Sequence, residues 1–165
     1  MSFTDDRTLT RPIKLFDAVS AARKAFNQLA TDDRLGLLQV VYENMDGPIS
    51  PAATGAARLQ FAQGLLTKVK TLSQSEQLDF MRNLTDCRDT PMTRSYGILT
   101  RNTKLAFWFQ LSEMMRSGTV LGVPSDHQLS QGAQEVFDMI VALEFGQRIS
   151  FLRQVVTDMG YESPE

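Results

Sequence analysis

The most informative part of the sequence is residues 102–117, which read NTKLAFWFQLSEMMRS. On a helix, the polar residues Gln110, Glu113 and Arg116 of this stretch fall on one side. An apolar surface covers roughly half of the circumference, whereas an ordinary surface helix needs a stripe only somewhat wider than about 100°. The residues of that surface are Leu105, Phe107, Trp108, Leu111, Met114 and Met115. We therefore expect this helix to be covered on two sides, either by two layers of helices or by one layer and an apolar ligand.

The N-terminal half of the chain shows helical spacing in two segments. Apolar residues recur three and four positions apart after Thr31, and Gly47 follows as a predicted stop. The same pattern runs over residues 53–72. Residues 1–17 are more weakly patterned, and we interpret them as an N-terminal arm that precedes a single helical domain over residues 18–165.

Capping signals mark the starts of further helices. Ser73 opens a capping box, Thr90 precedes a first-turn proline, and Ser130 caps a helix after a turn-rich connector. A last helix is predicted over residues 147–159 and stops at Gly160. No segment alternates with a period of two over the length of a strand, so we predict an all-α fold.

The bulk properties exclude several classes of protein. A net charge of -2 and a pI near 5.5 argue against a nucleic-acid partner, because phosphate binding needs a basic surface. The single cysteine, Cys87, cannot form an internal disulfide. No segment approaches the ~20 apolar residues of a membrane span, and charged residues occupy the N-terminus where a signal peptide is apolar. We expect a cytoplasmic protein without an integral membrane segment.

Candidate catalytic and metal-binding residues are few. His127 is the only histidine, and without a second histidine or a cysteine cluster it cannot complete a typical metal site. Cys87 has no histidine partner that could make it a nucleophile, and the pair Asp32 and Asp33 is typical of a helix start. We therefore predict no catalytic residue, no metal and no enzymatic activity.

Charge is distributed unevenly along the chain. Between Arg82 and Arg116 the sequence has six basic and three acidic residues. From Asp126 onward it has two basic and seven acidic residues. This asymmetry has two interpretations, which are two ordinary solvated faces and an oriented docking surface.

Residues 102–109, NTKLAFWF, resemble the asparagine-x-lysine-leucine-glycine-phenylalanine-tryptophan-tyrosine segment of the N-terminal domain family of orange carotenoid proteins. Further matching segments keep the family spacing almost without gaps from about Leu29 to Tyr161. They are Asp89-Thr90-Pro91, Ala56-Ala57 through Gln60-Phe61-Ala62, Leu152-Arg153, and Val156 with Asp158-Met159-Gly160. Within this family the chain resembles the stand-alone members called helical carotenoid proteins.

The resemblance implies two interleaved, discontinuous four-helix bundles with a carotenoid tunnel between them. The ligand it implies is one ketocarotenoid of the canthaxanthin, echinenone or 3'-hydroxyechinenone type. Two-domain members of the family have a C-terminal domain of mixed fold, on which their light-driven switch depends. That domain does not occur in this sequence, so we expect a chain that stays in the active-like, red-shifted state.

The resemblance also implies which residues line the tunnel. Phe109 stands where the family has tyrosine, and Gln39 stands where it has a tryptophan that contacts the pigment. The second departure implies a wider or more polar end of the tunnel. The other implied tunnel residues are Leu35, Tyr42, Met81, Leu105, Trp108, Met115, Val123 and Pro124.

Arg153 matches the arginine that in the family contacts the other domain or, once freed, the phycobilisome. In this sequence it lies one turn from Ile149 and Val156, beside an apolar stripe, where an arginine is usually a snorkelling side chain. Arg153 therefore has two interpretations, a docking contact and a snorkelling side chain.

The implied function is photoprotection, in which the carotenoid deactivates singlet oxygen physically and no side chain acts as acid, base or nucleophile. One alternative is a constitutive quencher of phycobilisome excitation at the thylakoid, which needs a docking face that includes Arg153. Another alternative is a carotenoid carrier or helical interaction module that hands the pigment to a homologue of the C-terminal domain.

Overall fold

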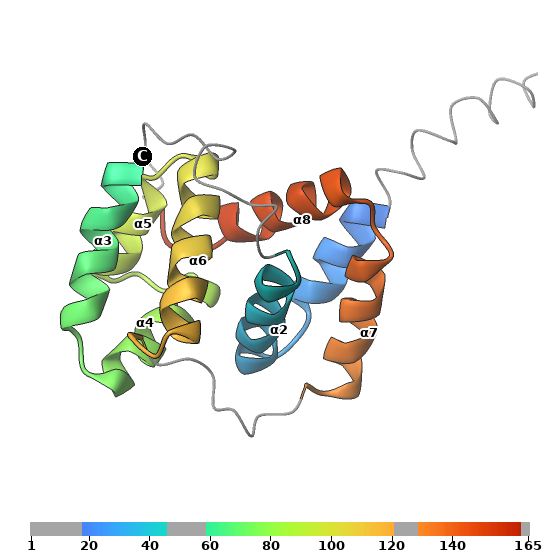
Figure 1. The fold of residues 1–165 in the computed structure, drawn as a ribbon, viewed down its shortest axis with the longest axis horizontal. Helices are drawn as coiled ribbons and strands as arrows, with labels where there is room; N and C mark the ends of the chain where they lie inside the picture. Colours follow the sequence, from blue (N-terminus) through green and yellow to red (C-terminus); the bar gives the residue numbers. More distant parts are fainter. Residues whose placement is uncertain (1–17, 46–58, 121–128, 163–165) are drawn as a thin grey trace, which may run out of the picture.

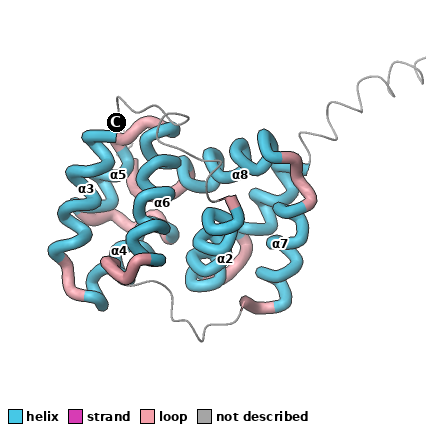
Figure 2. Tube along the Cα trace, viewed as in Figure 1, coloured by secondary structure: helices cyan, strands magenta, loops and turns pink. Residues whose placement is uncertain are grey.

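The computed structural model describes residues 18–45, 59–120 and 129–162, and helices are the only regular secondary structure in these ranges (Figure 2). The first helix spans residues 18–27. The others are α2 (Thr31–Asn44), α3 (Leu59–Thr71), α4 (Gln74–Thr85), α5 (Pro91–Gly97), α6 (Arg101–Arg116), α7 (Gln131–Val141) and α8 (Phe145–Thr157). None of the helices in these ranges has the length and apolar character needed to cross a membrane. The prediction of an all-α fold is confirmed.

The helices form two groups that lie side by side (Figure 1). The first group holds α3, α4, α5 and α6, and the second holds the helix 18–27 together with α2, α7 and α8. The second group is discontinuous, because the chain leaves it after α2 and returns to it with α7. Contacts of α8 with α6, and of α2 with α4 and α6, join the two groups. The predicted arrangement of two four-helix groups is confirmed, and in the described ranges only the second group is discontinuous.

Predicted capping signals operate at the starts of α4, α5 and α7. The Ser73 hydroxyl accepts the Glu76 N–H at 3.3 Å, while the Glu76 carboxylate accepts the Ser73 N–H at 2.9 Å. The hydroxyls of Thr90 and Ser130 each accept the backbone N–H three residues further on, at 3.0 and 3.1 Å. These bonds satisfy N–H groups that a helix start otherwise leaves without a partner.

Two helix starts lie earlier than predicted. α6 begins at Arg101, one residue earlier, because the Thr100 side chain supplies the cap. α8 begins at Phe145, two residues earlier, because a glutamine in its first turn accepts the Glu144 N–H at 3.0 Å. Three further predictions lie outside the described residues: the arm over 1–17, the stop at Gly47 and the helix start at residue 53.

The core of the first group is built around Phe107. Its ring meets Phe80, Tyr96 and Trp108 edge to face, with centroid distances of 6.4, 5.3 and 6.0 Å. None of these four side chains is more than 4% exposed. Burying one such ring contributes about 1.5–3 kcal/mol to stability, so this cluster holds α4, α5 and α6 together.

The residues after α8 tie the second group to the first. The Gly160 N–H donates to the Leu84 oxygen at 2.9 Å, and the Tyr161 N–H donates to the Thr93 oxygen at 3.1 Å. Gly160 has a φ of +81°, a left-handed conformation that glycine adopts without steric cost. The chain thus turns at Gly160, as the sequence predicted, and its next residue contacts α5.

Candidate functional site

Five residues predicted to line a ligand tunnel are buried on α2, α4 and α6, where α2 of the second group contacts the first group. We call this contact the seam. The five side chains are at most 5% exposed and belong to one continuous hydrophobic cluster. They are Leu35 and Tyr42 of α2, Met81 of α4, and Leu105 and Trp108 of α6.

Tyr42 makes a hydrogen bond across the seam. Its hydroxyl donates to the backbone oxygen of Leu105 at 3.1 Å. Burial raises the pKa of Tyr42 well above its ordinary value, so the phenol remains a protonated donor at neutral pH. Because its one polar atom is satisfied by the backbone, the rest of the Tyr42 side chain contributes only apolar surface to the seam.

Trp108 is also satisfied within the protein. Its Nε1–H donates to the Tyr96 hydroxyl at 3.0 Å, and that hydroxyl donates to the Val156 oxygen at 2.6 Å. No buried side-chain nitrogen or oxygen in the described part of the chain lacks a partner. The seam therefore offers an apolar wall without a polar atom that requires a polar ligand.

The remaining predicted tunnel residues are distributed around this wall or lie outside the described ranges. Phe109 and Met115 of α6 are partly buried and pack against the core. Gln39 of α2 is half-buried, one turn before Tyr42. Val123 and Pro124 fall outside the described residues, so their predicted role remains a prediction.

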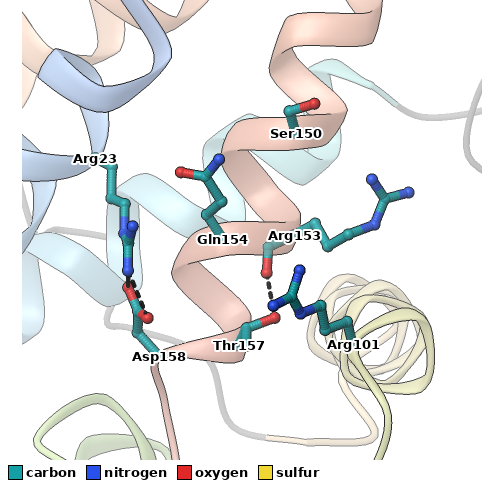
Figure 3. A pocket seen from close by; sticks show the side chains of 7 residues that line it. All are labelled: Arg23, Arg101, Ser150, Arg153, Gln154, Thr157 and Asp158. Atoms are coloured by element: carbon teal, nitrogen blue, oxygen red, sulfur yellow. Dashed lines mark hydrogen bonds and ion pairs between the residues drawn. The ribbon is translucent and has the colours of Figure 1, made fainter. Parts of the chain in front are cut away.

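Arg153 lies in a polar pocket of about 360 Å³ that no seam residue lines (Figure 3). Its Nε donates to Asn102 Oδ1 at 3.0 Å and so links α8 to the first turn of α6. The residues that line the pocket are Arg23, Arg101, Ser150, Arg153, Gln154, Thr157 and Asp158.

The pocket is cationic although Arg153 lies in the acidic third of the sequence. Arg23 pairs with Asp158 at 2.8 Å on one side of α8, and Arg101 and Arg153 lie on the other side (Figure 3). Within the described ranges neither of these two arginines is paired with a carboxylate. A charge count along the chain missed this cluster, because its members come from three distant segments.

The family model for the N-terminal domain of orange carotenoid proteins matches residues 13–162. The chain belongs to this family. A curated orange carotenoid-binding domain-containing protein of Nostoc sp. (strain PCC 7120) is 47% identical over 167 residues, covering 98% of each chain. The orange carotenoid-binding protein of Synechocystis sp. (strain PCC 6803) is 38% identical over 145 residues. The chain spans about half the length of that relative, since the match covers 88% of this chain and 46% of the relative.

Two solved structures of the orange carotenoid protein family are similar to the chain in fold. The orange carotenoid protein of Anabaena (Nostoc) sp. PCC 7120, binding canthaxanthin, has a TM-score of 0.82 and 40% identity, over 89% of this chain and 48% of that one. The red carotenoid protein of the same organism, also binding canthaxanthin, has a TM-score of 0.76 and 34% identity, over 87% of this chain and 99% of that one. Both structural similarities extend over most of the described helices.

Proposed function

We propose that the chain binds one ketocarotenoid of the canthaxanthin or echinenone type along α6, between the two helix groups, and protects by physical quenching of singlet oxygen. The observation that carries this proposal is the buried seam of aromatic, aliphatic and methionine side chains, in a core where no buried side-chain nitrogen or oxygen of the described residues lacks a partner. The canthaxanthin held by two similar structures supports the choice of ligand.

The dimensions of α6 suit such a pigment. α6 has 16 residues and is about 24 Å long at about 1.5 Å per residue. A polyene of about twenty bonds advances roughly 1.2 Å per bond and is ~25 Å long. Burying its two faces removes several hundred Å² from water, on the order of 10 kcal/mol before ordering costs.

The protein's part in this function is to bind and orient the pigment and to exclude water from it. Trp108 and Tyr42 supply rings, and Met81 and Met115 supply thioethers that adapt to a conjugated chain. The bound pigment supplies a low triplet state that takes up the excitation of singlet oxygen and releases it as heat.

The pigment-loaded protein is expected to shorten the lifetime of singlet oxygen in solution, measured by its near-infrared phosphorescence after a photosensitiser pulse. The apoprotein at the same concentration is expected to shorten it far less, because only its oxidisable side chains react. Equal lifetimes for the two forms would exclude photoprotection of this kind even if pigment were bound.

The cationic pocket favours a second candidate function, which is docking to the phycobilisome and quenching of its excitation. Arg101 and Arg153 offer guanidinium groups to an anionic partner surface, and no carboxylate of the described residues is paired with either of them. Attraction of this kind is screened over about 8–10 Å at physiological salt, so it should weaken with ionic strength.

Substituting Arg153→Leu is expected to leave singlet-oxygen quenching unchanged and to reduce any quenching of phycobilisome fluorescence. The reason is that Arg153 lies in the polar pocket and not at the seam. The measurement mixes pigment-loaded protein with isolated phycobilisomes at low and moderate phosphate. Arg116→Leu is the control, because Arg116 is an exposed arginine at the other end of α6. Antenna quenching of equal strength in wild type and Arg153→Leu would show that this pocket is not the docking face.

A further inference from the structure

The Tyr96 hydroxyl joins three helices through two buried hydrogen bonds. It accepts the Trp108 Nε1–H at 3.0 Å and donates to the Val156 oxygen at 2.6 Å. Tyr96 lies in α5, Trp108 in α6 and Val156 in α8, so the bonds link both helix groups. A phenol hydroxyl accepts and donates at the same time, which is what this position requires.

The Tyr96 ring is confined by its neighbours. A Cβ built on Gly160 would lie 2.4 Å from Tyr96 Cδ1, which places the backbone directly against the ring edge. Phe107 meets the ring at a centroid distance of 5.3 Å, and Lys104 Nζ lies 5.3 Å from its centroid, within the range of a cation–π interaction. The side chain is 0% exposed. The Tyr96 ring is therefore held in one position, and its hydroxyl is kept in place as a hydrogen-bond partner.

The position of the Tyr96 hydroxyl restricts the orientation of the Trp108 ring. An indole has a single donor and no acceptor, so a rotation that breaks its bond to Tyr96 leaves a buried N–H without a partner. Phe107 packs edge to face on the indole at 6.0 Å and an interplanar angle of 90°, which also limits rotation. Trp108 is a predicted tunnel residue, whereas Tyr96 belongs to a different helix, α5, and is not among the predicted tunnel residues.

We propose that Tyr96 is a positioning residue, whose hydroxyl sets the orientation of the Trp108 ring and thereby the contact that this ring makes with a bound polyene. The orientation of the ring is a property of the apoprotein, and only the effect on the polyene rests on the proposed function. Tyr96 itself does not touch the pigment in this scheme.

The first test is the fluorescence and near-ultraviolet circular dichroism of the apoprotein. Trp108 is the only tryptophan in the chain, so the indole emission and the long-wavelength indole dichroism bands report on this ring. For Tyr96→Phe we expect an emission maximum at shorter wavelength, because the excited indole loses an N–H hydrogen bond, and a loss of the indole dichroism bands. Signals identical to those of the wild type would overturn the proposal.

Two control variants separate this effect from a general loss of stability. Tyr161→Phe removes a phenol hydroxyl from the segment after α8 and should leave the Trp108 signals unchanged. Ser130→Ala removes the cap of α7 in the other helix group and should lower stability without moving these signals. If either control reproduces the Tyr96→Phe spectra, the effect is one of stability and the proposal fails.

A measurement on the wild type covers the case in which Tyr96→Phe does not fold. The indole N–H of Trp108 should exchange with solvent deuterium far more slowly than that of free tryptophan, because the residue is 2% exposed and its N–H is hydrogen-bonded. Exchange as fast as in free tryptophan would show that Tyr96 does not hold the ring.

The second test uses the pigment-loaded protein. We expect Tyr96→Phe to retain pigment at unchanged stoichiometry, with a shifted absorption maximum. If neither variant nor wild type takes up pigment, the proposed function fails, while the apoprotein spectra still decide the orientation of Trp108. An unshifted absorption spectrum together with shifted apoprotein signals would refute the link to the polyene.

Discussion

Replacing Trp108 by alanine is expected to remove most of the bound pigment and to lower the free energy of unfolding by about 3–5 kcal/mol. The ring is 2% exposed and packs edge to face on Phe107, so its loss opens a cavity in the core and deletes one wall of the predicted tunnel. Pigment per chain, determined by extraction and absorbance, and the melting temperature of the apoprotein measure the two effects.

The Trp108→Ala variant needs a control variant that loses a similar amount of stability. Phe151 of α8 is 0% exposed and packs edge to face on Phe26 at 5.7 Å in the second helix group, and neither residue is a predicted tunnel residue. Phe151→Ala should cost a similar free energy and still retain pigment at a temperature where it is folded. If Trp108→Ala retains pigment as well as Phe151→Ala does, Trp108 does not line the tunnel.

Replacing Gly160 by alanine is expected to destabilise the protein by roughly 2–4 kcal/mol, although only one methyl group is added. Its φ of +81° is strained for any residue with a Cβ, and the new Cβ would lie 2.4 Å from the buried Tyr96 ring. Since 1 kcal/mol shifts the melting temperature of a domain of this size by about 2–4 °C, thermal unfolding should detect the change clearly.

Two other glycines separate the strain from the clash. Gly118 has a φ of +82° with nothing within 4 Å of its ideal Cβ, so Gly118→Ala should cost only the strain of the left-handed conformation. Gly64 lies inside α3 with open space around it, and Gly64→Ala should stabilise the helix by up to about 1 kcal/mol. A Gly160→Ala variant that loses no more stability than Gly118→Ala would show that the Tyr96 ring moves away from the new Cβ at little cost in free energy.

The fold could be predicted from the sequence where the signals are local. Side-chain caps at Ser73, Thr90 and Ser130 act within three residues, and all three were recognised. The wide apolar surface of α6 indicated a helix covered on two sides, and α6 does pack against α3 of its own group and against α2 and α8 of the other. The start of α8 was missed, because glutamate is not a common cap residue.

The site could be predicted only in part, because its decisive contacts are non-local. The residues around Trp108 could be named through a family resemblance, but periodicity gave no sign that Tyr96, twelve positions earlier, holds the indole N–H. The pocket at Arg153 depends on Arg23 and Arg101, and no count of charges along the chain brings these three together. Such contacts arise only when helices distant in sequence pack against one another.

The proposal that the seam holds a pigment can be decided by expressing the full 165-residue chain in a host that accumulates canthaxanthin and determining pigment per chain in the purified protein. We predict one carotenoid per chain, with an absorption maximum at longer wavelength than that of the free pigment, because the rings and thioethers of the seam confine and polarise the polyene. A folded, helical but colourless protein from the same pigmented cells would contradict the account.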